Sequence, residues 1–265
     1  MLWARARDSS PASRSSCAPV ATPSGPLPDT RCNRRRSSRA PWGIDAVGAA
    51  SLPLVGLTTV QGLVDRAQAR SGQRILIHAG SGGLGSFALQ YARHLGLRVE
   101  TTTSSGNAVW VGALGADRVI AYDREDYRTA GAVFDIVFDT LGGAHTLDAF
   151  DLMKPGGCVV SVAGPPDAQM RARFGGNPLA RAAMAWIARK VQARSRARGV
   201  RYFRYLTESS GAQLAGIAAL VEAGEIRPVI DSVSDFADLP AAMVRLGGGR
   251  SRGKLVLCVN PVAVP

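Results

Sequence analysis

The chain has 265 residues, 46% of them hydrophobic, which is enough for one large or two ordinary domains with a real core. No uninterrupted apolar stretch approaches the roughly 18 to 20 residues that cross a bilayer, and the start of the chain lacks the apolar core of a secretory signal. The four cysteines form no C-x-x-C pair and only three histidines are present, which argues against a disulfide framework and a zinc site. We therefore expect a soluble cytoplasmic protein with no membrane partner and no metal.

The net charge of +12 is concentrated in two segments. Residues 1–41 carry eight arginines against two aspartates, and residues 170–201 carry nine cations and no acid. Residues 1–41 are also rich in Ser and Pro without apolar periodicity, which predicts a disordered tail or an organellar transit peptide. A mis-set start codon in a GC-rich gene would give the same composition, and we favour this mis-translated tail.

Apolar periodicity predicts an α/β protein. A helix is expected over 49–68, with Pro53 close to its start. Strands and helices then alternate as strand 74–79, helix 83–95, strand 97–103, helix 107–114, strand 118–122, strand 134–139, helix 144–152 and strand 157–163. This rhythm predicts a doubly wound parallel sheet of the Rossmann type.

The rhythm breaks after Gly164. The predicted elements that follow are a basic helix 179–197, strand 200–206, helix 212–223, strand 226–233, helix 239–246 and strand 254–259. The basic helix, with Met184, Ile187, Ala188 and Val191 on one side, could bind nucleic acid, but a solvated helix is the favoured interpretation. Strand 200–206 suits a sheet edge. Cys158 and Cys258 fall in predicted strands, where we expect buried and inert thiols.

A glycine-rich turn separates the strand at 74–79 from the helix that follows. It consists of Gly80, Ser81, Gly82, Gly83, Leu84 and Gly85, a G-x-G-x-x-G pattern. We expect Gly80 to permit the tight turn, Gly82 to let phosphates approach the backbone, and Gly85 to let helix and strand pack closely. Because free N–H groups at a helix start attract anions, this context predicts a nicotinamide dinucleotide site.

Six ordered segments carry a resemblance to a known superfamily. They are ASLPLVGLTT (50–59), HAGSGGLG (78–85), LGAD (114–117), FDIVFDTLGG (134–143), KPGG (154–157) and GKLVL (253–257). Together they resemble the medium-chain dehydrogenase/reductase superfamily, most closely its zinc-free quinone oxidoreductase branch, which includes zeta-crystallin. The resemblance implies a dinucleotide-binding domain paired with a GroES-like catalytic β-barrel, of which only a remnant is recognisable in this chain.

The resemblance divides the chain into four expected parts. Residues 1–41 are the tail, and residues 42–72 are a helical lead-in from the truncated catalytic domain. Residues 73–228 are the NAD(P)-binding Rossmann domain, and residues 229–265 return to the catalytic-domain remnant.

The resemblance also implies which residues contact the cofactor. Beyond the glycine turn they are Thr58 beside the nicotinamide, Thr103, Ser104 and Asn107 at the adenosine ribose, Tyr122 over the adenine, and Thr140, Ala163, Gly164, Phe203 and Lys254. In NAD-binding members an acid stands where Thr103 lies, so its absence favours NADP(H). Arg124 is a further candidate for the 2′-phosphate, and Glu100 is the acid that would instead favour NAD. The barrel's substrate-facing residues have no counterpart, so no catalytic residue is named.

Three functions compete at this point. The favoured one is a zinc-independent oxidoreductase in which NADPH passes a hydride to a quinone, an enone or a similar carbonyl compound. The second is a non-catalytic or truncated NADP(H)-binding fragment, because the barrel that would position a substrate is largely missing. The third, nucleic-acid binding through the basic helix, is disfavoured. A homodimer is expected from the edge strand.

Overall fold

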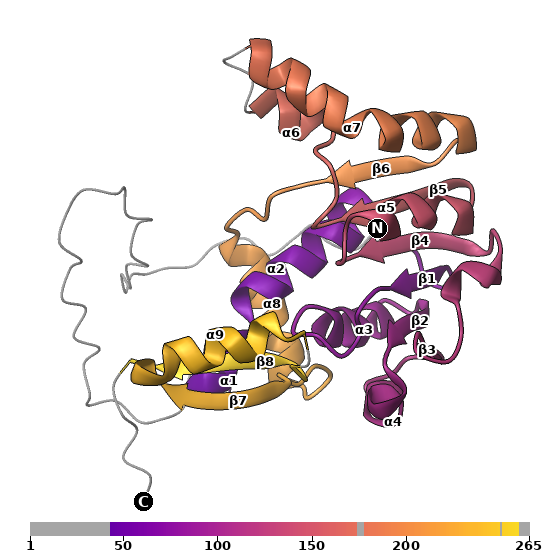
Figure 1. Ribbon diagram of the computed structural model, residues 1–265. Helices are drawn as coiled ribbons and strands as arrows, with labels where there is room; N and C mark the ends of the chain where they lie inside the picture. The colour runs from indigo at the N-terminus through magenta and orange to yellow at the C-terminus, as the bar shows by residue number, and fades with distance from the viewer. Residues whose placement is uncertain (1–42, 174–177, 250, 260–265) are drawn as a thin grey trace, which may run out of the picture. The chain divides into compact units, whose positions relative to one another are not determined.

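Six parallel strands form the central sheet, in the order β3-β2-β1-β4-β5-β6 (Figure 1). They are β1 (Arg74–Ile77), β2 (Arg98–Thr103), β3 (Arg118–Ala121), β4 (Phe134–Asp139), β5 (Met153–Ser161) and β6 (Arg201–Arg204). This is the strand order of a Rossmann fold, so the predicted fold class is confirmed. The chain order changes direction between β1 and β4, where such folds place their ligand crevice.

The computed structural model describes residues 43–173, 178–249 and 251–259, which belong to a compact unit spanning 38–265. The predictions for residues 1–41 therefore lie outside the described residues. The boundaries proposed at residues 72 and 228 fall inside this unit, and they remain a proposal.

Strand side chains alternate between two apolar layers. Ile75 and Ile77 belong to one layer and Leu76 to the other, and all three are fully buried. The first layer includes residues from α2 (Pro53–Val60), α3 (Gly85–His94) and α8 (Gly211–Glu222). The second includes residues from α5 (Ala144–Ala149) and α7 (Pro178–Arg198). Because helices cover both faces, the central strand β1 is apolar at Ile75, Leu76 and Ile77 in succession, as expected of a parallel sheet, whereas β2 buries Glu100 and three threonines.

The helix predicted over 49–68 consists of three pieces. α1 (Ala46–Ser51) begins earlier than expected, because the Asp45 side chain accepts a hydrogen bond from the Gly48 N–H at 2.7 Å and caps it. Pro53 then starts α2, since a proline without an N–H is tolerated only in a first turn. A π-helical turn, Gln61–Arg66, ends the segment.

Helices α4 (Ala108–Ala113) and α9 (Leu239–Gly247) appear near their predicted positions. Helix α6 (Ala168–Arg173) lies in the segment after Gly164 for which no element was predicted. Short 3₁₀ turns lie at Ser105–Asn107, Tyr127–Ala130, Phe150–Leu152 and Phe236–Asp238. Helix α7 covers the predicted basic helix, and its Ala188 and Val191 are buried as expected. Ile187 lies on the same side of this helix, but it is 54% exposed.

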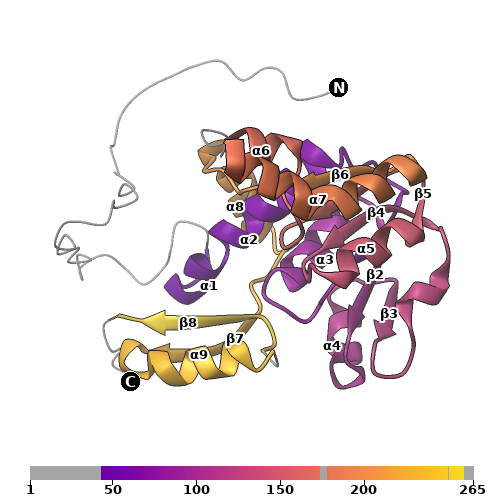
Figure 2. The same cartoon turned by 45° about the horizontal axis from the view of Figure 1, so that its top comes forward.

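A small second sheet lies at the C-terminal end of the described chain (Figure 2). It pairs β7 (Ile230–Asp235) with β8 (Lys254–Cys258) in parallel, and α1 and α9 both contact these strands. The strand predicted over 226–233 begins later because Ile226 is buried in the main core. A β-bridge between Gly82 and Gly253 joins β8 to the glycine turn.

Candidate dinucleotide-binding site

The glycine turn is shaped by contacts that differ from those expected. The Gly80 N–H donates to the Thr102 carbonyl at 2.9 Å, and the Gly82 N–H donates to the Ala79 carbonyl at 2.9 Å. The left-handed residue of the turn is Ala79, with φ +53°, so the reason given for Gly80 was wrong. Gly80 has to be small because a Cβ there would overlap the Thr101 hydroxyl, which donates to the Ile77 carbonyl.

The start of α3 is open to an anion. A Cβ on Gly85 would overlap the Ala79 carbonyl, so helix and turn pack closely, as predicted. No side chain caps this helix start, and its first turn holds no acid. The Ser86 N–H donates to the Gly82 carbonyl at 2.9 Å, and the other N–H groups of the helix start and the positive end of the helix dipole remain available to a phosphate.

Lys254 brings a positive charge to the same turn. The Gly253 N–H donates to the Ser81 carbonyl at 2.9 Å, which fixes the start of β8 against the turn. The aliphatic part of Lys254 covers Gly83, where a Cβ would lie 2.7 Å from the lysine Cδ. Burial lowers the pKa of Lys254 below its ordinary value. Within the described residues no carboxylate forms an ion pair with it.

A cavity of about 710 Å³ lies beside the turn, at the carboxyl ends of β1 to β4. It is lined by Ala79, Ser81, Thr102, Thr103, the segment 122–128, Leu141, Ala144, His145, Asp148 and Gly249. Four predicted residues therefore share this cavity, namely Ser81, Thr103, Tyr122 and Arg124. The Thr103 hydroxyl is buried and has no partner in the described chain, and the Tyr122 ring is 63% exposed. A volume of this size suits an adenosine group.

Charged side chains on the cavity wall are unequally engaged. Asp123 accepts hydrogen bonds from the Ser105 N–H and hydroxyl at 2.8 and 2.6 Å, and these bonds lower its pKa. Arg128 binds Asp126 at 2.8 Å. Arg124 makes no ion pair within the described ranges, so its guanidinium is available to a ligand.

Glu100 has a structural role instead of the alternative ribose contact. It lies in the middle of β2 and is not part of the cavity wall. Its carboxylate binds Arg74 at 2.5 Å and approaches Arg118 at 3.7 Å. The carboxylate thus lies between two arginines and away from the cavity, and its Oε2 makes no hydrogen bond within the described chain.

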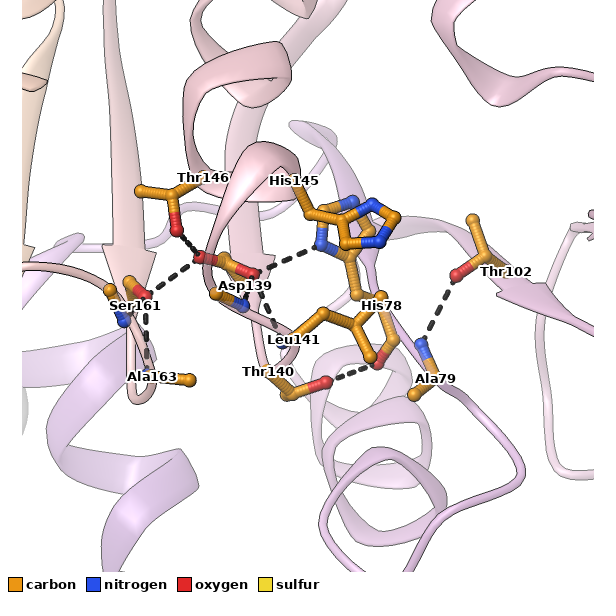
Figure 3. A network of polar contacts seen from close by, with 12 residues as sticks. His78, Ala79, Thr102, Asp139, Thr140, Leu141, His145, Thr146, Ser161 and Ala163 are labelled. Carbon is orange, nitrogen blue, oxygen red and sulfur yellow. Dashed lines mark hydrogen bonds and ion pairs between the residues drawn. The ribbon is translucent and has the colours of Figure 1, made fainter. Parts of the chain in front are cut away.

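A buried network of polar contacts lies at the ends of β4 and β5, next to the cavity (Figure 3). One carboxylate oxygen of Asp139 accepts from the backbone N–H groups of Leu141 and Gly142 at 3.0 and 2.9 Å and contacts His78 Nδ1 at 3.3 Å. The other accepts from the hydroxyls of Thr146 at 2.5 Å and Ser161 at 2.8 Å. Every contact to this carboxylate is a donor contact.

These donors keep Asp139 ionised in the core. Burial alone would raise the pKa of Asp139, but hydrogen bonds from His78, Thr146 and Gly142 outweigh it and hold the pKa well below its usual range. The His78 ring is fully buried and packs edge-on against Tyr127 and His145, which line the cavity. His78 is thus a core group, as expected.

The remaining predicted residues fall into three places. Thr140 donates to the His78 carbonyl at 2.9 Å, and the Gly164 N–H donates to Ser161 Oγ at 2.7 Å, so Thr140, Ala163 and Gly164 border the Asp139 network. Ser104 and Asn107 bind each other at 3.1 Å outside the cavity wall.

Thr58 and Phe203 lie away from the cavity. The Thr58 hydroxyl contacts the Leu54 carbonyl and Thr207 Oγ1 at 2.6 and 2.7 Å. Phe203 pairs with Val160 within the sheet and packs on the core. Their contacts with a cofactor remain predictions.

Sequence reasoning missed the network around Asp139. An acid and a hydroxyl at the ends of two apolar strands, Asp139 and Ser161, were its only signal, because their partner Thr146 lies on a following helix. Cys158 is buried with a pKa raised to about 12 by burial, as its expected inertness requires, whereas Cys258 is only half-buried. In the part of the chain that the structure describes, no three His, Cys, Asp or Glu side chains gather as a metal site requires.

The fold and the turn together define a Rossmann-type nucleotide-binding protein. A family model described as zinc-binding dehydrogenase matches residues 114–257. The chain belongs to the medium-chain dehydrogenase/reductase superfamily, in its quinone oxidoreductase-like branch.

Individual relatives agree with this membership. The mitochondrial NAD(P)H oxidoreductase RTN4IP1 of Danio rerio is 32% identical over 225 residues, covering 80% of this chain and 56% of the relative. The 2-methylene-furan-3-one reductase of Solanum lycopersicum is 30% identical over 224 residues, covering 82% and 48%. The quinone oxidoreductase structure from Coxiella burnetii aligns with a TM-score of 0.65 at 31% identity, covering 80% and 60%. The chain thus spans about half the length of these curated relatives.

No helix among the described residues is long and apolar enough to span a bilayer. The cytoplasmic location stays a prediction, since one relative is named as mitochondrial.

Proposed function

We propose that this chain binds NADPH as part of a zinc-independent oxidoreductase that reduces a quinone, an enone or a similar carbonyl compound. The observation that carries the proposal is the glycine turn, where an uncapped helix start meets the Lys254 side chain. Two sources of positive potential at one backbone turn suit a pyrophosphate. Gly82 leaves room for it, because a Cβ there would meet only the Ala79 carbonyl within 4 Å.

The adenosine half fits the neighbouring cavity. The Tyr122 ring can cover the adenine, and the unpartnered Thr103 hydroxyl lies where β2 ends, the place of the ribose in this fold. Of the acids nearby, Glu100 is held by arginines outside the cavity wall, and Asp123 is engaged by the N–H and hydroxyl of Ser105. Arg124 supplies a cation for a 2′-phosphate, which favours NADPH over NADH.

The substrate class is supported by the relatives. Their names include a quinone oxidoreductase and a reductase of a methylene-furanone, which is an enone. When bound, NADPH supplies the hydride, and this chain's residues fix the position of the cofactor. The start of α3, the Lys254 side chain and the cavity wall would contact the phosphates and the adenosine of the cofactor. Catalysis therefore also needs groups that hold the substrate.

Cofactor binding without turnover is the second candidate function. One observation favours it: outside the six-stranded sheet, the described residues contain only the two-stranded β7–β8 sheet. That sheet offers little wall to enclose a nicotinamide and a substrate. Both candidates share the same cofactor site.

One experiment separates the candidates. Calorimetry measures NADPH and NADH binding, and absorbance at the reduced-nicotinamide band follows NADPH consumption with 1,4-benzoquinone and methyl vinyl ketone. Turnover with tighter NADPH binding supports the reductase, binding without turnover supports the second candidate, and the absence of binding contradicts both. The variant Gly82→Ala tests the glycine turn. It should fold, since the added Cβ meets only one atom at 3.3 Å, but it should bind NADPH more weakly than the wild type.

A further inference from the structure

We infer that Asp139 is a positioning residue, which holds the loops after β4 and β5 in the shape that receives the nicotinamide half of the cofactor. The inference rests on the proposed function. Asp139 itself is fully buried and does not line the cavity described above, so it acts through its neighbours. The neighbours are the backbone of Leu141 and Gly142 on one side and the hydroxyl of Ser161 on the other (Figure 3).

The network fixes each loop through backbone groups. Two N–H groups of the first loop bind one oxygen of Asp139. In the second loop, Ser161 accepts from the N–H groups of Ala163 and Gly164 at 3.3 and 2.7 Å while its own hydroxyl donates to Asp139. One carboxylate therefore sets both loops at once. Thr140, Ala163 and Gly164, all predicted cofactor contacts, lie in these loops.

The two loops also contact each other directly. A Cβ on Gly142, which has φ +75°, would lie 2.6 Å from the Ala163 carbonyl, so the loops are already as close as backbone allows. A Cβ on Gly164 would lie 2.8 Å from Ser161 Oγ and 2.5 Å from the Tyr202 hydroxyl. Because the two loops are in close contact, we expect that losing a hydrogen bond to Asp139 or Ser161 shifts one loop relative to the other.

An amide cannot replace the Asp139 carboxylate, because both carboxylate oxygens accept hydrogen bonds and an amide has only one such oxygen. Asp139 accepts from five donors and donates to none. In Asp139→Asn the amide nitrogen must face either the two backbone N–H groups or the two hydroxyls. If the amide nitrogen faces the backbone N–H groups, hydrogen-bond donors point at one another. If it faces the hydroxyls, Ser161 has to accept a hydrogen bond where it now donates one. Either arrangement disturbs one of the loops.

Of the two loops, only the one after β5 is expected to serve a single half of the cofactor. Leu141 in the loop after β4 lines the adenosine cavity, whereas Ser161, Ala163 and Gly164 do not. A disturbed β5 loop should therefore weaken binding of the whole dinucleotide and spare binding of its adenosine fragment. A loss of general stability would affect both ligands together.

The test compares two ligands by calorimetry on the full chain, NADPH and adenosine 2′,5′-bisphosphate. In Ser161→Ala we expect the Kd for NADPH to rise about tenfold, as the loss of one buried hydrogen-bond relay implies, and the Kd for the bisphosphate to change less than twofold. Ser51→Ala is the matched control, since it removes a buried hydroxyl that binds only the Gly48 carbonyl of its own helix.

The outcomes separate this inference from the proposed function. Equal weakening of both ligands, or no change in either, overturns the positioning role of Asp139. If wild-type protein binds neither ligand, the proposed cofactor site itself fails. Asp139→Asn repeats the test if Ser161→Ala does not fold, and failure of both variants to fold assigns the network to stability alone and overturns the inference.

Discussion

At the scale of single residues, positive charge reaches the candidate site from two side chains with different surroundings. Arg124 lies on the cavity wall without an ion pair in the described chain, while Lys254 is half-buried against the glycine turn. The guanidinium can bind a phosphate through several donors, whereas the ammonium acts as a compact charge whose pKa responds to burial. The two residues therefore make different predictions.

Replacing Arg124 should change cofactor preference. In Arg124→Gln we expect the Kd for NADPH to rise about tenfold, because a charge-assisted hydrogen bond to the 2′-phosphate is lost, and the Kd for NADH to stay within twofold. Fluorescence titration of both nucleotides measures this. Arg98→Gln, at an exposed position on the other end of β2, is the control. An equal loss for both nucleotides would contradict a role for Arg124 at the 2′-phosphate.

Lys254 should make cofactor affinity depend on pH in the alkaline range. Burial lowers its pKa below 10.5, and a bound pyrophosphate favours the charged form, so binding is accompanied by proton uptake. The Kd for NADPH should therefore rise as pH increases through the pKa of the free protein. The Lys254→Arg variant should keep its affinity for NADPH over the same pH range. The Lys254→Met variant should bind NADPH weakly, with a Kd that does not change with pH. A pH-independent wild type would contradict contact between Lys254 and phosphate.

At the scale of elements, the close approach of α3 to the turn before it determines how the glycines are used. A Cβ on Gly85 would overlap backbone atoms of both Ala79 and Gly80. Backbone cannot move aside as a flexible side chain can, so the helix has to shift.

Gly85→Ala should therefore lower the free energy of unfolding by about 2 kcal/mol, within the range found for overpacked cores. Gly216→Ala in α8 is the matched control. It meets nothing within 4 Å, and should be neutral or stabilise by about 0.5–1 kcal/mol because alanine favours helix. Urea denaturation of both variants gives the difference. Equal stability of the two would show that α3 can move.

The sequence predicted elements whose signals are local. Strand and helix alternation follows from apolar periodicity, and the edge position of β6 followed from its flanks. The site divided in the same way. Ser81 belongs to the glycine turn that the local pattern predicted, and Thr103 and Tyr122 came from the family resemblance. All three line one cavity, because the ends of parallel strands meet at one edge of the sheet.

Features that depend on distant contacts were not predictable. The π-helical end of the first helical segment reflects contact with the sheet, where a Cβ on Gly62 would lie 2.9 Å from the Phe138 ring. The left-handed residue at Ala79 and the burial of Asp139 likewise arise from packing between elements. Periodicity carries no information about either.

At the scale of the whole molecule, β6 leaves one side of the sheet without a strand partner in the described residues. Open strand edges favour pairing with another chain, and a two-fold axis would join two such edges. We therefore expect a homodimer. Sedimentation equilibrium over a hundredfold range of protein concentration measures the mass, and a monomer at every concentration would contradict dimerisation through β6.

The attachment of β8 to the glycine turn has a consequence for motion. Because the Gly253 N–H binds the Ser81 carbonyl and Lys254 covers Gly83, any ligand on the turn also holds the last described strand. Linkage between two equilibria is reciprocal. Fraying of β8 must therefore lower the affinity for the ligand by the same factor by which the bound ligand lowers the equilibrium constant for fraying. Amide exchange at the C-terminal strand would then report occupancy of a turn that lies some 170 residues earlier in the chain.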